Sequence, residues 1–278
     1  MAFAPDSKTL GLCQMATAFG FRTADNAVQL WDVATGDRLA GFKARGVVNT
    51  IAFSPDGRLL AAAPWVSLFP IPIVLDPYAD PGNLVHIWDR QSGQALKLSA
   101  SYRFWVRGLA FSPDSIRMAV ANYKHISLLD VRERQEVHRF ICHALAYWPS
   151  YSSDGKFIAA ADRHGRVYVW DVDTGKDHMA TPFRTWCRDS VVFSPVVDLV
   201  AATDDYRTVS FLDARTGLAV KKTSFPEGAP CPFFFTPDGE AIVGGGMETN
   251  PVVHMWDAST GNELHRWDLT AILDREGL

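Results

Sequence analysis

Two short segments of this chain combine tryptophan with flanking arginines. They are YRFWVR and FRTWCR, with Arg103, Trp105 and Arg107 in the first and Arg184, Trp186 and Arg188 in the second. A guanidinium group forms paired hydrogen bonds with a carboxylate or a phosphate, and a neighbouring aromatic ring can pack on the ligand or on the arginine. These residues are therefore candidates for binding an acidic or phosphorylated protein segment. The alternative is that both tryptophans fill seams between sheets while the arginines are only solvated.

A third candidate is the segment 64–83, PWVSLFPIPIVLDPYADPGN, which holds five prolines together with Trp65, Phe69 and Tyr78. Prolines lower the entropy lost when a loop becomes ordered on a partner, and aromatic anchors often dominate the energies of interfaces. The segment could equally be a lid that folds its own aromatic rings onto the protein. Both interpretations stay open at this point.

The elements that position these segments are short strands that end in Trp-Asp or a near variant. Three of the six copies are VQLWD, VHIWD and VYVWD, and the others are ISLLD, VSFLD and VHMWD. Their closing aspartates are Asp32, Asp89, Asp130, Asp171, Asp213 and Asp257, which gives successive intervals of 57, 41, 41, 42 and 44 residues. This period is typical of four-stranded propeller blades once an insertion accounts for the first interval.

A second phrase precedes each closing strand, where an apolar strand runs into a turn, as in AFSPDG (52–57) and FFTPDG (234–239). Proline presets φ, aspartate bonds its own backbone and glycine accepts positive φ, so this phrase predicts a tight hairpin. The fifth unit keeps only VFSPVVD (192–198). Thr-Gly or Ser-Gly follows most closing strands and predicts another turn.

These paired phrases resemble the WD-repeat family of β-propellers, and the resemblance covers nearly the whole chain. It implies four strands, a to d, in each unit. We therefore expect an all-β fold, a β-propeller of about six four-stranded antiparallel blades in a single domain over residues 1–278. The resemblance also implies large inter-blade side chains at Trp31, Trp88, Trp170 and Trp256.

The chain departs from the family in two ways. No Gly-His pair precedes strand a, so the buried His, Trp, Ser or Thr and Asp network of the family cannot be complete in most blades, although Asp162 can still cap its turn. The first unit also begins almost inside strand a, which leaves no evident N-terminal strand exchange for closure. Either six blades close by packing alone, or the chain is part of a longer propeller. The second possibility predicts dimerisation.

The family usually recruits the face that carries the b-to-c and d-to-a loops. The b-to-c connection is long in the first two units, where the turn and closing aspartates lie 26 and 33 residues apart, against 16 and 17 in the next two. The insertions 19–26 and 64–83 should therefore share this face. Eight cations against two acids fall in the d-to-a segments, namely Lys43, Arg45, Arg103, Arg107, Arg139, Arg184, Arg188 and Lys222 against Asp189 and Glu227. This face should be locally positive.

Overall composition gives no such bias. The 278 residues carry 27 basic and 31 acidic side chains, a net charge of −4, which predicts neither nucleic acid nor an acidic membrane surface as a partner. No uninterrupted apolar run is long enough for a membrane helix. The four cysteines have no zinc-ligand spacing, and we expect free thiols in a cytoplasmic protein without a metal or a cofactor.

No catalytic motif of a serine hydrolase, a zinc protease or a nucleotide-binding loop is found in the sequence. The sequence therefore predicts a non-enzymatic scaffold for protein interactions. The alternative is a propeller hydrolase with an active site in its axial channel, using His143, Asp189 or Arg188.

Overall fold

The computed structural model describes residues 1–13, 28–44, 47–65, 85–96, 106–184, 191–205, 208–225, 233–245 and 252–268. Within these ranges, the structure describes only the backbone at 47, 49, 64, 65, 179–184, 204 and 205. The chain divides into two compact units, Met1–Ile141 and Cys142–Leu278, and each is considered by itself.

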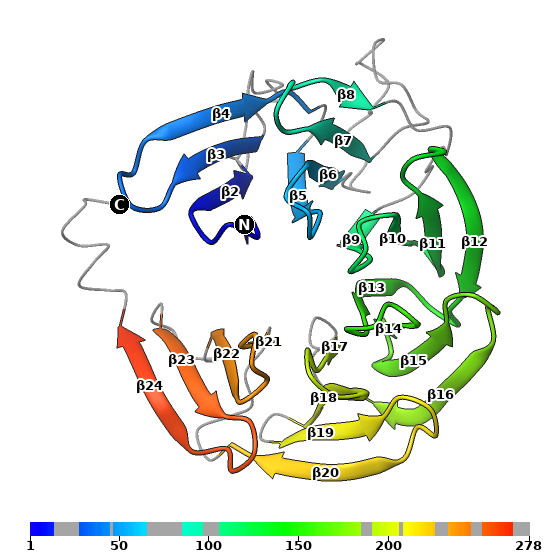
Figure 1. Cartoon of the computed structure of the whole chain (residues 1–278). Helices are drawn as coiled ribbons and strands as arrows, with labels where there is room; N and C mark the ends of the chain where they lie inside the picture. The colour runs from blue at the N-terminus through cyan, green and yellow to red at the C-terminus, as the bar shows by residue number, and fades with distance from the viewer. Residues whose placement is uncertain are drawn as a thin grey trace, which may run out of the picture. The chain divides into compact units, whose positions relative to one another are not determined.

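The first unit holds three four-stranded antiparallel sheets, blades 1 to 3, and in each of them every strand pairs with the next along the chain (Figure 1). Blade 1 consists of β1 (Ala2–Phe3), β2 (Thr9–Cys13), β3 (Val28–Asp32) and β4 (Arg38–Phe42); blade 2 of β5 (Val47–Phe53), β6 (Leu59–Trp65), β7 (His86–Asp89) and β8 (Ala95–Leu96); blade 3 of β9 (Val106–Phe111), β10 (Arg117–Asn122), β11 (His125–Asp130) and β12 (Gln135–Ile141).

The second unit repeats the same topology in blades 4 to 6. Blade 4 consists of β13 (Ala146–Tyr151), β14 (Phe157–Asp162), β15 (Arg166–Asp171) and β16 (Asp177–Arg184); blade 5 of β17 (Val191–Phe193), β18 (Leu199–Asp205), β19 (Thr208–Asp213) and β20 (Ala219–Ser224); blade 6 of β21 (Phe233–Phe235), β22 (Ala241–Gly245), β23 (Val252–Asp257) and β24 (Glu263–Asp268). The prediction of an all-β propeller fold with six four-stranded blades is thereby confirmed. The single domain, the mode of closure and dimerisation stay predictions.

The second strand of blade 4, β14, is buried along its whole length from Phe157 to Asp162. Such a strand lacks the usual alternation of apolar and polar residues because neighbouring sheets cover both of its faces. In the core shared by blades 4 and 5, Ala159 and Ala161 lie among Val191, Phe193 and Val200. Small side chains let the sheets approach closely, so apolar packing between blades supplies most of the core.

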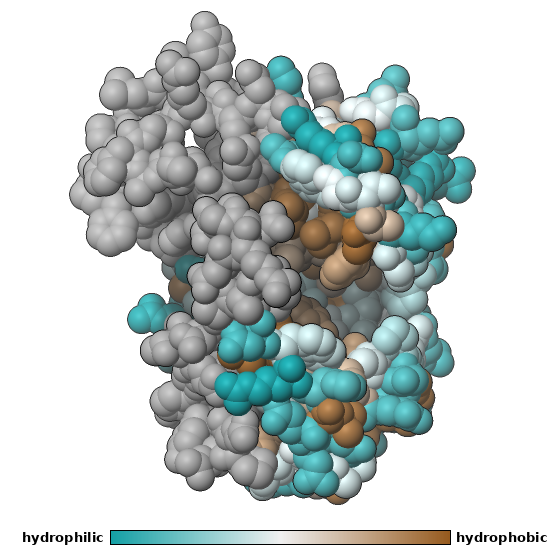
Figure 2. Space-filling view, turned by 90° about the vertical axis from the view of Figure 1, so that its left-hand side faces the viewer, coloured by the Kyte–Doolittle hydropathy of each residue, from teal (hydrophilic) through white to brown (hydrophobic). Residues whose placement is uncertain are grey.

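Outer strands have the opposite character. Every residue of β24 is exposed, and only Thr223 of β20 is buried. Figure 2 shows one face of the molecule, on which the coloured side chains are mostly hydrophilic and the hydrophobic ones form smaller patches. The outermost strand of these blades therefore contributes more to the surface than to the core.

The tryptophans of the closing strands pack mainly between blades, as predicted. Trp88 of blade 2 and Phe42 of blade 1 have ring centroids 5.4 Å apart, and Trp256 of blade 6 meets Phe225 edge-on at 5.7 Å. Trp170 is also buried, whereas Trp31 is only half-buried. Such aromatic pairs contribute about 0.5–1.5 kcal/mol beyond the area that they bury.

Candidate functional site

Each blade has two ends with different chemistry, because antiparallel strands return the chain to them alternately. We call the turn end the one that carries the a-to-b and c-to-d turns, which in blade 2 are 54–58 and 89–94. The opposite one is the loop end, which in blade 4 carries 142–145 and 163–165. The sequence analysis assigned all of the predicted binding residues to the loop ends.

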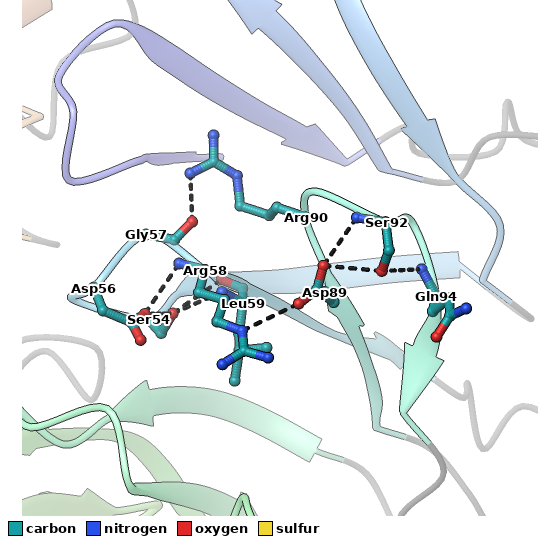
Figure 3. A network of polar contacts seen from close by, with 9 residues as sticks. All are labelled: Ser54, Asp56, Gly57, Arg58, Leu59, Asp89, Arg90, Ser92 and Gln94. Atoms are coloured by element: carbon teal, nitrogen blue, oxygen red, sulfur yellow. Dashed lines mark hydrogen bonds and ion pairs between the residues drawn. The ribbon is translucent and has the colours of Figure 1, made fainter.

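At the turn end, the Ser-Pro-Asp-Gly phrase satisfies its own polar groups (Figure 3). The hydroxyl of Ser54 donates to the Asp56 carboxylate and accepts the amide of Leu59 at 2.8 Å, while Asp56 also accepts the amide of Arg58 at 3.0 Å. Gly57 closes the turn with φ of +72°, which a side chain would make strained. Ser112 with Asp114, Ser152 with Asp154 and Thr236 with Asp238 repeat the hydroxyl-to-carboxylate bond.

The closing aspartate is likewise used by its own turn. Asp89 Oδ1 accepts the amide and the hydroxyl of Ser92, both at 2.9 Å, and its Oδ2 accepts Arg58 Nε at 3.2 Å (Figure 3). These hydrogen bonds, first of all that from the Ser92 amide, lower the pKa of Asp89 to about 2. The aspartates that mark the repeat therefore have a structural role at the turns and do not form a catalytic carboxylate pair.

Polar contacts also connect the turn ends of adjacent blades in the first unit. Arg90 of blade 2 donates to the Gly57 carbonyl at 2.8 Å and lies 3.6 Å from the Asp6 carboxylate of blade 1. The Asp56 amide in turn donates to Ser115 Oγ of blade 3 at 3.1 Å. The turn ends of blades 1, 2 and 3 are therefore joined to one another as well as closed within themselves.

The structure places three of the predicted binding residues at loop ends by their backbone. Trp65 ends β6 opposite Val47, Arg107 lies near the start of β9, and Arg184 ends β16. Because β6 packs against β9, Trp65 and Arg107 belong to the loop ends of adjacent sheets. The other predicted residues lie outside the described residues, namely Phe69, Tyr78, Arg103, Trp105, Trp186 and Arg188.

Three of the cations assigned to the loops lie in outer strands. Arg184 is the last residue of β16, whereas Arg139 and Lys222 lie further inside their strands. Arg139 belongs to β12, where its guanidinium group pairs with Glu136 at 2.7 Å, and Lys222 belongs to β20 opposite Ser210. The charge of Arg139 is thus countered locally. The positive potential of the loop ends must come from other residues.

The sequence analysis overlooked the tight b-to-c turns of blades 3 and 4. Tyr123 and Lys124 form the first of these turns, with Tyr123 at φ of +49° and Lys124 Nζ 5.8 Å from its ring centroid. Arg163 and His164 are exposed in the second. The intervals of 16 and 17 residues were the signal, since so short a connection forces its residues to the surface.

Under the turn of blade 4 lies a network of three side chains, in which Asp162 and Tyr168 are buried and His143 is exposed. Asp162 accepts the amides of His164 and Arg166 through Oδ1 and the Tyr168 hydroxyl through Oδ2, at 2.8, 3.1 and 2.7 Å. His143 contacts the same hydroxyl through its amide and its Nδ1, both at 3.0 Å. Burial raises the pKa of Tyr168. Asp162 caps its turn as predicted, and Tyr168 joins it to the histidine that precedes strand a.

Comparison with known proteins agrees with this geometry. A sequence model described as "WD domain, G-beta repeat" matches residues 36–67 and 134–171. Residues 36–67 and 134–171 are thus similar to WD40 repeats. The WD repeat-containing protein SL1-17 of Schistosoma mansoni is 30% identical over 140 residues, which cover 48% of this chain and 45% of that protein. The match thus spans less than half of that relative. WD40 proteins are in general non-enzymatic scaffolds for protein interactions.

The two WD40 matches run across the boundaries between blades. The first begins at Gly36, after the closing strand of blade 1, and ends just beyond β6; the second begins at Arg134, before β12, and ends at Asp171 of blade 4. A WD40 repeat in sequence therefore comprises the outer strand of one blade and the inner strands of the next.

The loop end of blade 4 brings cationic residues together. Arg166, the first residue of β15, lies directly opposite Arg184, the last residue of β16. Like charges at opposite ladder positions are destabilising. The carboxylate of Asp162 is close in sequence, but it is buried and turned toward Tyr168.

Within the described residues, no group of three or more His, Cys, Asp or Glu side chains could hold a metal ion. The same part of the chain contains no helix that is long and apolar enough to span a membrane.

Proposed function

We propose that this WD40 protein is a non-enzymatic scaffold whose loop ends bind an acidic or phosphorylated protein segment. The proposed binding residues are Trp65, Phe69, Tyr78, Arg103, Trp105 and Arg107 at the loop ends of the first unit, and Arg184, Trp186 and Arg188 at those of the second. We add Tyr123 and Lys124 of blade 3 and Arg163 and Arg166 of blade 4. Scaffolding is the general role of the family, whereas the charge and the chemistry of the partner are our inference.

The observation that carries the proposal is the pair of arginines at opposite ladder positions, Arg166 and Arg184, with Arg163 in the adjoining turn. Asp162, which directly precedes Arg163 in the sequence, accepts hydrogen bonds from the backbone of its own turn and from the Tyr168 hydroxyl. Guanidinium groups suit carboxylates and phosphates because they offer several donors in a fixed plane. An anionic segment is therefore the partner that best matches this end of the blade.

Blade 3 supports the same chemistry. Lys124 stands over the ring of Tyr123 in an exposed turn, and Arg107 enters the blade at the same end. An aromatic ring beside cations supplies flat apolar area for the backbone or side chains of a bound peptide.

Two contacts support a structural role for His143, which the hydrolase alternative would use as a catalytic residue. Its amide and its imidazole both contact the Tyr168 hydroxyl, which is itself bonded to Asp162. This arrangement positions the chain before β13 and favours the scaffold over the hydrolase.

We also propose a cytoplasmic location. Cys13 and Cys142 are free thiols, and burial raises the pKa of both. Thiols that are buried and protonated are weak nucleophiles, which suits a protein that does not depend on disulfides.

The test is a binding titration with the triple variant Arg163→Ser, Arg166→Ser and Arg184→Ser, here called the loop-end variant. The probe is a fluorescein-labelled octapeptide of alternating glutamate and serine, with and without phosphorylation, followed by fluorescence anisotropy. We expect the affinity to fall at least about tenfold, since one charge-assisted hydrogen bond contributes about 1.5–3 kcal/mol and about 1.4 kcal/mol corresponds to a factor of ten.

The matched control replaces three exposed cations at turn ends, Lys8→Ser, Arg132→Ser and Lys176→Ser, and so removes the same charge. Its affinity for the peptide should change by less than about twofold, because only long-range attraction is lost. Equal losses in the two variants would show that net charge, and not the loop ends, attracts the peptide. Circular dichroism checks that both variants fold, because arginine stems also cover apolar surface.

A further inference from the structure

The turn end of blade 5 departs from the other WD40 blades at one turn. Val196 and Val197 stand where blade 2 has Asp56 and Gly57. No residue of 194–199 has a positive φ, and the turn closes instead by a bond from the Leu199 amide to the Val197 carbonyl at 2.7 Å. Valine is branched at Cβ and resists the left-handed conformation that glycine accepts. The two side chains are 56% and 50% exposed.

These valines border a groove of about 470 Å³ between blades 5 and 6 of the second unit. Leu199, Phe211 and Phe235 contribute its apolar lining. Its volume lies in the range of sites that receive a small ligand or a few side chains.

One wall of the groove is held by close packing. A Cβ atom added to Gly239, in the Pro-Asp-Gly turn of blade 6, would lie only 2.6 Å from Val196 Cγ2. Val196 is thus packed against the neighbouring turn although half of its surface faces solvent. The apolar wall exists before any partner binds, which reduces the ordering cost of binding.

The charges around the groove favour a cationic occupant. Lys221 is the basic residue of the lining, and its ammonium group already lies over the Phe211 ring at 5.4 Å and 3.5 Å from the Ala258 carbonyl. Glu240 and Asp257 are the two acids. Asp257 accepts the amides of Ser259 and Thr260 through Oδ1, which keeps it ionised. The lining therefore carries one positive and two negative charges.

We propose that this groove is a second docking site, which binds an extended peptide segment of a partner protein through one apolar side chain flanked by lysine or arginine. The apolar side chain lies against Val196, Val197 and Phe235, and the flanking cation faces Glu240 and Asp257. The site prefers a partner of opposite charge to the one proposed for the loop ends. It does not depend on the loop-end proposal.

The decisive variant restores the sequence of the repeat by the changes Val196→Asp and Val197→Gly, here called the groove variant. It removes the exposed apolar wall and supplies the residues that close the other turns, so it should fold. The probes are immobilised heptapeptides with a central leucine, isoleucine, valine or phenylalanine between two lysines. Matching peptides carry a central serine, or glutamates in place of the lysines.

We expect the full chain to retain at least one lysine-flanked apolar peptide fivefold or more over its serine-centred and glutamate-flanked counterparts. The groove variant should lose this retention even though it gains a carboxylate, and Glu240→Gln should reduce it about twofold. The control is Val137→Ser in the outer strand of blade 3, where a valine is 47% exposed; it should bind as the unaltered chain does.

Three results would overturn the proposal. They are the absence of any preferred lysine-flanked peptide, equal retention by the groove variant, and a preference for glutamate-flanked peptides. Sedimentation of both proteins tests another occupant: if the unaltered chain forms a dimer that the groove variant abolishes, a second copy of the chain fills the groove and not a cationic partner.

Discussion

The a-to-b turns of blades 2 and 5 both begin with Ser-Pro but continue as Asp56-Gly57 and Val196-Val197, and one presents a polar surface and the other an apolar one. In blade 2, Ser54, Asp56 and Gly57 close the turn and satisfy its polar groups. Arg90 links this turn to Asp6 of blade 1. In blade 5, two valines leave an apolar wall beside a groove. The repeat signature thus makes a self-contained turn, and its loss creates a surface that can bind.

The largest expected effect is the loss of stability when a buried tryptophan is removed. Comparing this loss next to blade 1 and next to blade 5 tests whether the difference between the two regions is confined to the turns. Trp88→Ala beside blade 1 and Trp256→Ala beside blade 5 should each lower the free energy of unfolding by about 3–5 kcal/mol, because each removes a buried aromatic side chain from an inter-blade core. Urea denaturation of both variants measures these losses. A much smaller loss for Trp256→Ala would mean that the core under the groove is itself loose, so that the comparison involves more than the turn.

Transferring the valines to blade 2 should destabilise the protein by about 2–6 kcal/mol. Asp56→Val with Gly57→Val removes a hydrogen-bonded carboxylate and forces a β-branched residue toward φ of +72°, and each change costs about 1–3 kcal/mol. The free energy of unfolding provides the measurement. The groove variant is the reciprocal exchange. Its gain of turn hydrogen bonds is opposed by the greater entropy that glycine gives the unfolded chain, so its free energy of unfolding should change by less than about 1 kcal/mol. Similar losses in both directions would contradict the view that the signature determines turn stability.

A pair of glycine substitutions isolates the contact that holds the groove wall. Gly57 and Gly239 have nearly equal φ, +72° and +73°, but an added Cβ meets only Arg90 Nη1 at 3.6 Å in the first case and Val196 Cγ2 at 2.6 Å in the second. Gly57→Ala should cost about 1 kcal/mol from backbone strain alone, and Gly239→Ala about 1–2 kcal/mol. Val196→Ala should remove the excess in Gly239→Ala, as a double-mutant cycle would measure.

The smallest expected effect is the loss of unfolding free energy at low pH, and it should occur at the turn ends of both blade 2 and blade 6. Hydrogen bonds within the turns hold the pKa of Asp89 and of Asp257 at about 2, below the ordinary value of 3.8. Their contribution to stability is therefore complete above pH 3.8 and is lost as the pH falls toward 2. Asp89→Asn and Asp257→Asn should each flatten the decline of the unfolding free energy between pH 4 and 2. A decline as steep as in the unaltered chain would contradict the assignment.

Much of the fold was predictable because two phrases recur in a fixed order. A strand before Ser-Pro-Asp-Gly and a strand before Trp-Asp have only a few compatible arrangements, and six copies leave the blade as the consistent one. The short interval between Asp114 and Asp130 also contained the exposed turn at Tyr123 and Lys124.

Other features depend on contacts between residues distant in sequence. The loss of Asp and Gly at 196 and 197 was visible, but the groove forms only because the turn around Gly239 approaches Val196 from the next blade. A search for Gly-His pairs could not find the His143 network, since its partner in strand c is Tyr168. Similarly, the pairing of Arg166 with Arg184 depends on the register of β15 and β16.

The most direct test of the account is one anisotropy experiment with two labelled peptides and two variants. The peptides are the glutamate-serine octapeptide and the best lysine-flanked apolar heptapeptide, and the variants are the loop-end and groove variants. We predict that the loop-end variant loses only the acidic peptide and the groove variant loses only the cationic one. If either variant loses both peptides or neither, the two ends of the blades do not act as separate binding surfaces.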